Sequence, residues 1–584
     1  MQKNISNSSV PNFDRNLKEQ NFSAIGSGSL GGKASGLVFI SQILQQKFKQ
    51  DEFPLIKLTL PKMIVLRSGV FESFMERNNL YNFAINEQSD IRIADRFLKA
   101  DIPAEILGDL RSLIEIEKTP LAVRSSSMLE DAKYEPFAGV YSTKMIPNNQ
   151  PSVDTRFTKL LEAVKFVFAS TYFRAAKNYF KSSSHKIENE RMAVIIQSVV
   201  GQNYNMRFYP NISGVARSYN FYPVGKSKRE QGVVNLALGL GKTIVDGGIS
   251  WIYSPQYPKS PPPFNDPKDI LKSTQNNFWA VNLTPIRNYD PTKETEYLSL
   301  LNLSDADYDN NLMHIASTYD AQSDRIEIGI NREGPRIINF SPLLHLNKFG
   351  FNASIKKILL TCEEAYNNPV EIEFAATISK NSELLNFAFL QVRPMVISSE
   401  VVAVEKENDK NNILVESSKV MGNGTIQNIF DVVFVKPDKF DKRDTTKIAE
   451  EIESLNKKLV EENKPYILIG FGRWGSSDPW LGIPVEWGQI SGAKVIVEST
   501  LFDINVELSQ GSHFFHNINS FNVSYFSINY DEKFKIDWNW LNEQEVVNEK
   551  IFVKHVGLKN SLLIKVDGRT GRGIIWKSIP IKIK

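Results

Sequence analysis

The residues best suited to chemistry lie in one stretch, 121–143, which combines an arginine with a run of hydroxyls and a later glycine. The apolar residues before Arg124 are typical of a strand that ends in a Ser-rich loop. A guanidinium offers a planar fork of donors to phosphate oxygens, and Ser125 and the two serines after it add neutral donors. Gly139 lets the backbone come close to a ligand. The stretch therefore indicates a phosphate-binding loop, with a polar loop between two strands as the alternative.

A second group of polar side chains lies within 370–395, which reads as two strands joined by a short polar turn. Glu371 and Glu373 share one face of the first strand, and a hairpin would bring Glu373 near Gln391. Two carboxylates beside an amide oxygen are hard ligands suited to Mg²⁺, and Arg393 would neutralise charge on a transferring group. The alternative is a hairpin with an exposed polar face.

A glycine-rich segment near the start, 24–44, ends in a predicted helix. Glycines from Gly26 to Gly32 form a loop that ends at Lys33, and apolar residues at helical spacing follow from Ala34. Such a turn collects backbone N–H groups at a helix N-terminus, and a lysine there adds a point charge for phosphate. By spacing alone the signal is weak, because glycine-rich loops before helices are common packing devices.

Two further segments carry polar or glycine-rich signals. Residues 191–201 read as an apolar strand that Gln197 interrupts. The run Gly-Leu-Gly-Lys-Thr at 239–243 suggests a P-loop, but a Walker A motif needs glycine where Leu236 stands, and the segment lies in mid-domain. We therefore reject the P-loop interpretation.

Residues 153–180 have helical spacing and predict one long amphipathic helix.

Taken in order, these features resemble the ATP-grasp domain that phosphoenolpyruvate synthase, pyruvate phosphate dikinase and rifampin phosphotransferase share. Two positions depart from the usual pattern: Pro136 stands where the family usually has Ser, and Lys242 where it usually has Glu. The matching signatures are Gly-Gly-Lys-Ala (31–34), Arg-Ser-Ser (124–126), Glu-Asp (130–131), Phe-Ala-Gly (137–139), Ser-Gly-Val-Ala (213–216), Gly-Leu-Gly (239–241), Glu-x-Glu (371–373) and Gln-x-Arg-Pro (391–394).

The resemblance implies a role for each candidate residue. Gln197 would recognise adenine, with a plain edge-strand glutamine as the alternative. The implied nucleotide contacts are Lys33, Ser125, Gly139, Gln197 and Gly241; the implied Mg²⁺ ligands are Glu371, Glu373 and Gln391; the implied catalytic residues are Arg124, Arg393 and, after the linker, His513.

His513 is implied because a swivelling phosphohistidine domain follows the ATP-grasp domain in the dikinases. Gln510-Gly511-Ser512-His513 is similar to the segment that carries the family's histidine. However, Phe514 and Phe515 stand where small residues normally follow. A structural histidine is the alternative, and His516 is the next candidate acceptor.

Composition and length give the broad class. The chain has 584 residues, 42% hydrophobic residues and a net charge of +3, which are ordinary globular values and give no indication of a nucleic-acid partner. Cys362 is the only cysteine, which fits a reducing compartment, so we expect a cytoplasmic protein. The first residues lack the apolar core of a signal peptide, and no apolar run is long enough to span a membrane.

We predict an α+β (α/β) fold in four parts. A disordered lead-in covers 1–22, an ATP-grasp domain 23–397, and a charged, Asn-rich linker 398–412. A smaller α/β domain, which we compare with the swivelling phosphohistidine domain, covers 413–584.

The expected function is that of an ATP- and Mg²⁺-dependent phosphotransferase, which passes phosphate through a histidine to pyruvate or another small molecule. The alternatives are a nucleotide-binding regulatory protein that has lost turnover, and a half-enzyme whose pyruvate-binding domain lies on a partner chain. A pyruvate-binding barrel needs about 250 residues and only about 170 follow the linker, so we expect that this chain alone makes no phosphoenolpyruvate.

Overall fold

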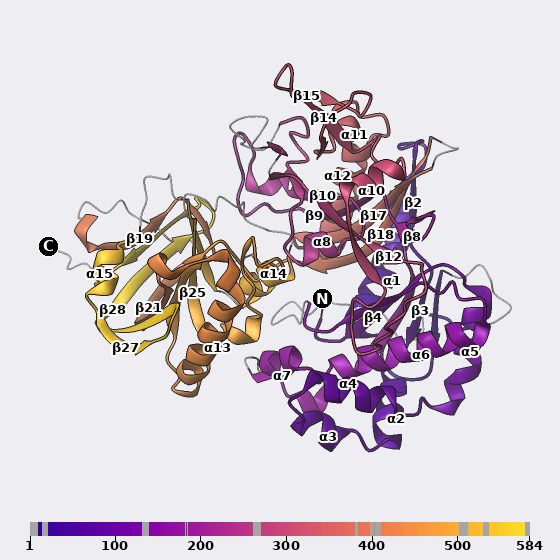
Figure 1. Cartoon of the computed structure of the whole chain (residues 1–584), viewed down its shortest axis with the longest axis horizontal. Helices are drawn as coiled ribbons and strands as arrows, with labels where there is room; N and C mark the ends of the chain where they lie inside the picture. Colours follow the sequence, from indigo (N-terminus) through magenta and orange to yellow (C-terminus); the bar gives the residue numbers. More distant parts are fainter. Residues whose placement is uncertain are drawn as a thin grey trace. The chain divides into compact units, whose positions relative to one another are not determined.

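The chain forms two compact units with a mixed α/β fold, as the sequence predicted (Figure 1). Unit 1 comprises Met1–Ser218, Gln231–Ile244 and Ile249–Met395, and unit 2 comprises Tyr219–Glu230, Val245–Gly248 and Val396–Lys584. The computed structural model describes residues 10–14, 21–130, 139–181, 183, 185–260, 270–271, 273–379, 383–397, 402, 404, 410–500, 512–521, 523–529 and 536–578.

The first sheet of unit 1 carries Arg124 and the three serines after it, which lie within a strand and not in a loop as predicted. Its strand order is β1-β3-β6-β4-β5, so β4 and β6 are flanked on both sides. The strands are β1 (Phe22–Ile25), β3 (Met63–Leu66), β6 (Met192–Ser198), β4 (Leu121–Ser127) and β5 (Thr143–Ile146). Because β6 is internal, Gln197 does not lie on an edge strand.

Helices α2 (Ser68–Arg77) and α6 (Val153–Ser170) pack on this sheet, and α4 (Asp90–Leu98) and α5 (Leu107–Ile116) pack on α6. The prediction of one helix over 153–180 is wrong, because the chain turns after α6 and begins α7 (Arg174–Lys181). Tyr172 lies in that turn and is buried against Phe71 and Phe97, so side-chain packing overrides the continuous helical spacing.

The second sheet of unit 1 contains the predicted hairpin. Its order is β11-β10-β9-β17-β18-β2, and β17 and β18 pair antiparallel with Glu373 opposite Gln391. The hairpin prediction is therefore confirmed. The strands are β11 (Trp251–Tyr253), β10 (Val233–Ala237), β9 (Ile212–Arg217), β17 (Val370–Ile378), β18 (Leu385–Pro394) and β2 (Ile56–Thr59).

Helix α1 (Gly31–Lys47) contacts strands of both sheets, namely β4 and β18, and also packs on α12 (Phe351–Tyr366). The buried face of α1 includes Leu37, Ile40 and Leu44, which repeat at helical spacing. This helix therefore packs against both the first and the second sheet of unit 1.

The remaining elements of unit 1 lie around these two sheets. Short strands form the orders β13-β12-β8-β7 and β15-β14-β16. They are β13 (Leu298–Asn302), β12 (Asn277–Asn282), β8 (Arg207–Tyr209), β7 (Gln202–Tyr204), β15 (Arg325–Ile328), β14 (Ala316–Asp320) and β16 (Arg336–Ile338), with helices α3 (Tyr81–Asn86), α8 (Lys242–Val245), α10 (Leu303–Tyr308) and α11 (Ser341–His345).

Unit 2 is built on one large sheet of order β19-β29-β28-β21-β22-β25-β26-β20, with β27 paired to β28. Strands β21, β22, β25 and β26 run parallel, so their connections are crossovers that contain helices α13 and α14. The strands are β19 (Ile413–Ser417), β29 (Arg572–Trp576), β28 (Val553–Asp567), β21 (Asn423–Val435), β22 (Tyr466–Phe471), β25 (Ala493–Ser499), β26 (Ser524–Ile528), β20 (Lys419–Met421) and β27 (Glu545–Glu549). The small pair β23 (Arg473–Trp474) and β24 (Gly482–Ile483) and the helices α13 (Thr445–Glu461), α14 (His513–Ser520) and α15 (Trp538–Asn542) complete the described part.

Several predicted segments fall partly outside the described residues. Within the predicted lead-in, residues 10–14 run beside β1, where the Phe13 N–H donates to the Ala24 carbonyl at 2.9 Å. Residues 1–9 and 15–20, and most of the predicted linker 398–412, lie outside the described part.

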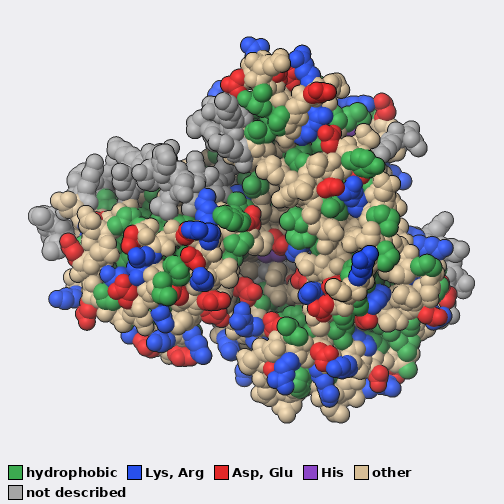
Figure 2. Space-filling model, in the orientation of Figure 1, with side chains coloured by type: hydrophobic (Ala, Val, Ile, Leu, Met, Phe, Trp, Pro, Cys, Tyr) green, Lys and Arg blue, Asp and Glu red, His purple; other side chains and the backbone are tan. Residues whose placement is uncertain are grey.

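The surface in Figure 2 shows Lys and Arg interspersed with Asp and Glu over the visible face, as a net charge of +3 suggests. None of the described helices is long and apolar enough to cross a membrane.

Candidate functional site

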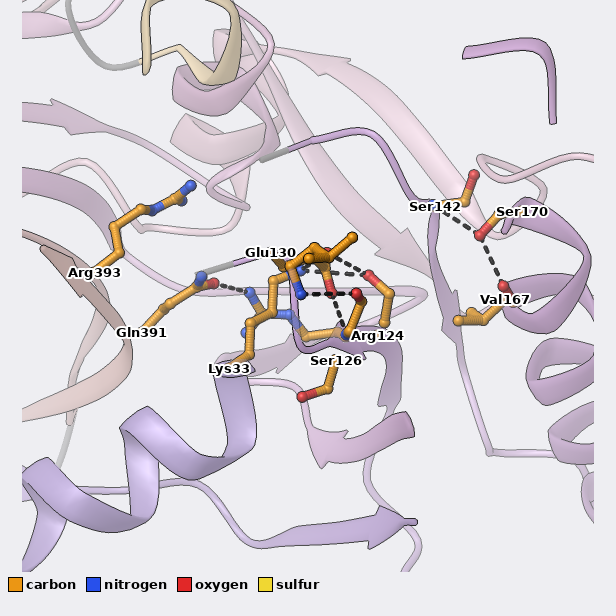
Figure 3. A network of polar contacts seen from close by, with 12 residues as sticks. Lys33, Arg124, Ser126, Glu130, Ser142, Val167, Ser170, Gln391 and Arg393 are labelled. Atoms are coloured by element: carbon orange, nitrogen blue, oxygen red, sulfur yellow. Dashed lines mark hydrogen bonds and ion pairs between the residues drawn. The ribbon is translucent and has the colours of Figure 1, made fainter. Parts of the chain in front are cut away.

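The first turn of α1 carries Lys33, close to the Ser-rich strand (Figure 3). The Lys33 Nζ atom lies 2.6 Å from Glu130 Oε1 and 3.4 Å from Ser125 Oγ. The helix begins at Gly31, so Lys33 belongs to its first turn and not to the preceding loop as predicted. Lys33 and Ser125 are therefore brought together, around a carboxylate that the sequence did not single out as a site residue.

Glu130 is the centre of this small network. Its side chain is 1% exposed, and it accepts hydrogen bonds from the Ser125 hydroxyl at 2.7 Å and the Ser127 N–H at 2.9 Å, besides the ion pair with Lys33. The Ser125 hydroxyl thus points to Glu130 in this structure. A phosphate group that binds Lys33 would compete with Glu130 for the ammonium.

A close approach between α1 and β4 fixes the position of Lys33. Gly31 has a φ of +77°, and a Cβ atom there would lie 1.5 Å from the Ser126 carbonyl oxygen, so only glycine fits. The Ser126 hydroxyl accepts from the Ala34 N–H at 3.1 Å and donates to the Leu30 carbonyl at 2.9 Å. These contacts join the two segments 31–34 and 124–126 that the sequence identified separately.

Arg124 connects the first and the second sheet of unit 1. From β4, its Nη2 atom donates to Gln391 Oε1 at 2.7 Å (Figure 3). The same Nη2 atom lies 3.7 Å from Glu373 Oε2. Its Nη1 atom lies 3.4 Å from Gln197 Oε1 on β6. The predicted phosphate-binding arginine is therefore in direct contact with two of the predicted metal ligands.

The hairpin carries a row of alternating charges. The register of β9, β17 and β18 sets Arg217, Glu371 and Arg393 directly opposite one another. Arg217 Nε donates to Glu371 Oε2 at 2.6 Å, and Arg393 Nε lies 3.0 Å from Glu371 Oε1. Arg393 also pairs with Glu373 through its Nη2 atom. Each of the two carboxylates thus has at least one arginine partner.

Arg217 is a site residue that the sequence analysis missed. It is 2% exposed, and burial lowers the pKa of its guanidinium while Glu371 opposes that shift. The available signal was a charged residue at the end of the apolar segment Ile212–Arg217, directly after the Ser-Gly-Val-Ala match. A buried arginine needs a carboxylate partner, but the sequence does not say which one.

The two glycines among the predicted nucleotide contacts lie on other loops. Gly139 has a φ of +67° and follows residues 131–138, which lie outside the described part together with Phe137 and Ala138. Gly241 lies between β10 and the single helical turn α8. Two residues before it, the Gly239 carbonyl accepts from the Ser213 hydroxyl at 2.5 Å.

The charges of this cluster favour an anion. Its four cations and three carboxylates leave one positive charge in excess, and these residues are Lys33, Arg124, Arg217 and Arg393 with Glu130, Glu371 and Glu373. A net positive cluster of arginine and lysine is suited to phosphate oxygens, so the residues fit ATP.

The residues also fit Mg²⁺ at one place. The Glu373 carboxylate is 13% exposed and the Glu371 carboxylate 4% exposed, so Glu373 is the more accessible of the two. Glu373 lies opposite Gln391 and offers, with its amide oxygen, two hard ligands of the kind Mg²⁺ prefers. The metal roles predicted for Glu371, Glu373 and Gln391 all remain predictions, because each of these side chains has an arginine partner in this structure.

Another buried carboxylate lies behind the Ser-rich strand. Burial raises the pKa of Glu190 to about 7, while a hydrogen bond from Ser127 opposes the shift. Ser127 in turn donates its N–H to Glu130. Strand β4, which contributes Ser125 to the contacts of Lys33, is therefore also in contact with Glu190, a carboxyl group whose pKa is raised to about 7.

In unit 2, His513 is the first residue of α14 and is partly buried. Ser512 precedes it and accepts from the Phe515 N–H at 3.2 Å, as an N-cap residue does. The Phe515 ring packs against Tyr222 and Tyr525. Residues 501–511, which include the predicted Gln510 and Gly511, lie outside the described part, and His516 lies in the same helix.

Tyr525 also bonds a buried carboxylate in unit 2. Its hydroxyl donates to Glu498 at the end of β25, and burial raises the pKa of Glu498 to about 7. Glu498 is 2% exposed.

Two curated proteins are similar to parts of the chain. The first is a protein described as "uncharacterized phosphotransferase YvkC" from Bacillus subtilis (strain 168), 28% identical over 201 residues, which are 34% of this chain and 22% of that protein. The second is a phosphoenolpyruvate synthase from Aeropyrum pernix, 26% identical over 242 residues, which are 38% of this chain and 26% of that protein. The chain thus spans about a quarter of the length of the curated relatives it matches.

The family assignment rests on a match over most of the chain. Residues 27–413 match the family model described as pyruvate phosphate dikinase, AMP/ATP-binding domain, and this range contains every candidate residue of unit 1. The chain therefore belongs to the pyruvate phosphate dikinase AMP/ATP-binding domain family.

Proposed function

We propose that the matched region binds Mg·ATP and that the chain acts as an ATP-dependent phosphotransferase of the phosphoenolpyruvate synthase type. The observation that carries the proposal is the contact of Arg124 with Gln391 and Glu373, which joins a phosphate-binding side chain to two hard oxygen ligands. Phosphoryl transfer is catalysed mainly by positioning and by charge neutralisation, and this arrangement offers both.

Each residue has a proposed role. Lys33 binds the phosphates, whereas Arg124 and Arg393 orient the transferring group and stabilise the negative charge that develops on it. Glu373 and Gln391 would hold Mg²⁺, which would neutralise negative charge on the phosphates. Ser125, Gly139, Gln197 and Gly241 are proposed as further nucleotide contacts.

The proposed binding event includes an exchange of partners. The Lys33 ammonium pairs with Glu130, and the phosphates take over that ammonium when ATP binds. Glu130 then keeps its hydrogen bonds from Ser125 and Ser127, so the loop retains its support. Affinity for ATP is therefore set partly by the strength of the Lys33–Glu130 pair.

We further propose that His513 accepts the phosphate and passes it to a small molecule, either pyruvate or another acceptor. A partner chain that carries a pyruvate-binding domain is a second possible source of the acceptor site. His516 is the alternative phosphate carrier, because it lies in the same helix as His513.

A second candidate function is nucleotide sensing without turnover. It is favoured by one observation: Lys33, Arg124 and Arg393 each have a carboxylate partner within the cluster, so none of the three needs a reacting phosphate as its partner. Under this function the protein binds Mg·ATP and releases it unchanged.

Product analysis separates the two functions. The purified chain is incubated with ATP and Mg²⁺, with and without pyruvate, and phosphorus NMR follows AMP, ADP, phosphate and phosphoenolpyruvate. Formation of AMP or ADP that is lost in Arg124→Ala supports the phosphotransferase. Tight Mg·ATP binding without products supports the sensor, and the absence of nucleotide binding refutes both.

A further inference from the structure

Two buried carboxyl groups of unit 1 share Ser127, the last residue of β4, as a hydrogen-bond donor. Glu130 accepts from the Ser127 N–H at 2.9 Å, and Glu190 accepts from the Ser127 side chain. Glu130 is 1% exposed and Glu190 4% exposed. Burial and, to a smaller extent, the charge of Glu130 raise the pKa of Glu190. The titrations of the two groups are therefore coupled, and we call them the Glu130–Glu190 pair.

Within the part of the chain that the structure describes, this pair holds one cation. The Lys33 Nζ atom lies 2.6 Å from Glu130 Oε1. Arg191 follows Glu190 in the chain and gives it a backbone hydrogen bond at 3.1 Å, but the Arg191 guanidinium pairs with Glu72 on α2 at 2.8 Å. The net charge of the pair therefore depends on Lys33.

Besides Arg191, the other titratable side chains that face the pair from the described elements are neutral or acidic. Tyr141, shortly before β5, hydrogen-bonds to Glu190, and Tyr172 lies in the turn after α6. Burial raises the pKa of both phenols, so both stay neutral near pH 7. Glu188 lies two residues before Glu190 and is acidic. When the ammonium is engaged elsewhere, a proton from solvent is the remaining means to neutralise the pair.

Engagement of Lys33 by phosphate would leave the pair without its cation. Two ionised carboxyl groups would then lie close together in a buried place, where desolvation and the charge of the other group disfavour each of them. Protonation of one carboxyl removes a buried charge and the repulsion at the same time. A protonated carboxyl still accepts hydrogen bonds, so the two that Ser127 donates would persist.

We propose that ATP binding is coupled to the uptake of one proton from solvent by the Glu130–Glu190 pair. As the phosphates take over the Lys33 ammonium, the proton takes over the neutralisation of the pair. This inference rests on the proposed binding of ATP at Lys33. It goes beyond that proposal, because it gives Glu190, which is not a proposed phosphate contact, a role in setting the affinity. Glu190 acts through Glu130 and is therefore a positioning residue.

The sign of the pH dependence follows from this coupling. In the free protein the pKa of Glu190 is about 7, so below this pH the pair already holds a proton and ATP binding takes up little more. Above pH 7 the free pair is ionised, and the complex holds more protons than the free protein. The affinity must then fall as the pH rises. We expect the Kd for Mg·ATP to rise about 3- to 5-fold from pH 7 to pH 8 and less than about 2-fold from pH 6 to pH 7.

Calorimetric titration of Mg·ATP into the full chain, in buffers that differ in ionisation enthalpy, counts the protons. The dependence of the observed enthalpy on the ionisation enthalpy of the buffer gives the number of protons taken up per ATP bound. Excess Mg²⁺ keeps the nucleotide in its Mg²⁺ complex at each pH. We expect about half a proton or more at pH 8 and less than about 0.2 at pH 6. No uptake at pH 8, or a release of protons, would overturn the inference.

Variants assign the proton to the pair. Glu190→Gln resembles the protonated side chain, so it should take up no proton at pH 8 and bind Mg·ATP there as tightly as at pH 7. Glu130→Gln should likewise abolish the uptake and serves as the second variant if Glu190→Gln does not fold. Glu498→Gln is the matched control, because Glu498 is also buried with a pKa of about 7 but belongs to unit 2. Wild-type uptake in Glu190→Gln, or an equal loss in Glu498→Gln, would overturn the inference. Weaker binding of Glu190→Gln by the same factor at both pH values would show a merely structural role and would also overturn it.

If the wild type binds no nucleotide, the proposed function fails, and the pair is tested without ATP. Lys33→Met, or Lys33→Gln if the first variant does not fold, removes the ammonium permanently. Infrared spectroscopy at pH 8 should then show a stronger band of protonated carboxyl in the variant than in the wild type, which supports the exchange of ammonium for proton. Equal bands in the two proteins would overturn it.

Discussion

The ion pair between Lys33 and Glu130 should limit the affinity for ATP, and Glu130→Gln tests this directly. The two charged atoms lie 2.6 Å apart, which corresponds to a gross attraction of about 6 kcal/mol at an effective dielectric constant of about 20. Most of this attraction is offset by desolvation, because the two side chains are only 11% and 1% exposed. We expect a net gain in ATP binding of about 1–2 kcal/mol, or roughly a 5- to 30-fold lower Kd.

The same substitution should reduce stability. Glu130 accepts from Ser125, Ser127 and Lys33, and a glutamine amide cannot accept at both of its terminal atoms, so one donor loses its partner. We expect unfolding to become easier by about 1–3 kcal/mol. The variant should thus bind ATP more tightly although it is less stable.

Isothermal calorimetry with Mg·ATP and thermal unfolding followed by circular dichroism measure the two effects. Glu117→Gln is a matched control, because Glu117 lies on the same unit and takes part in no contact of the cluster that the structure describes. An ATP affinity in Glu130→Gln that is equal to or weaker than that of the wild type would refute the competition between Glu130 and phosphate.

The other predictions concern catalysis, the histidine and pH. Arg124→Ala should lower kcat by at least about 10-fold and change the Kd for Mg·ATP less, because its charge acts mainly on the transferring group; equal effects on both would contradict this role. His513→Asn should abolish the acid-labile, base-stable label that radioactive ATP leaves on the protein, and label at the wild-type rate would move the assignment to His516. Burial raises the pKa of Glu498 from 4.5 to about 7, so the folded state holds this proton more tightly than the unfolded state. The stability contribution is complete below about pH 4.5 and is lost as the pH rises through 7, by up to about 1.4 kcal/mol per pH unit. Glu498→Gln should therefore flatten the decrease of melting temperature between pH 5 and 7, and an unchanged slope would show that Glu498 does not cause it.

Local patterns in the sequence predicted the hairpin well. The alternation around Glu371 and Gln391 specifies two strands, and the short turn between them limits their register. The turn alone would set Glu373 opposite Leu390, and a bulge between Glu373 and Phe374 sets it opposite Gln391. Lys33 was also identified near a helix start, because glycine-rich turns and helical spacing are local signals.

Features that depend on distant segments could not be predicted. The pairing of Arg217 with Glu371 joins strands 154 residues apart in the chain, and nothing near either residue specifies the partner. Similarly, the turn at Tyr172 arises from packing against Phe71 and Phe97, while the local spacing favours a continuous helix. The assignment of Tyr219–Glu230 and Val245–Gly248 to unit 2 likewise has no local signal.

The most direct test of the central proposal is calorimetric titration of Mg·ATP into the wild type and into Glu373→Ala. Glu383→Ala serves as the control, because Glu383 lies in the turn of the same hairpin and is 78% exposed. We predict that the wild type and Glu383→Ala bind Mg·ATP with the same affinity, and that Glu373→Ala loses at least about 10-fold in affinity and its dependence on Mg²⁺. Unchanged Mg·ATP affinity and unchanged Mg²⁺ dependence in Glu373→Ala would contradict the proposed site.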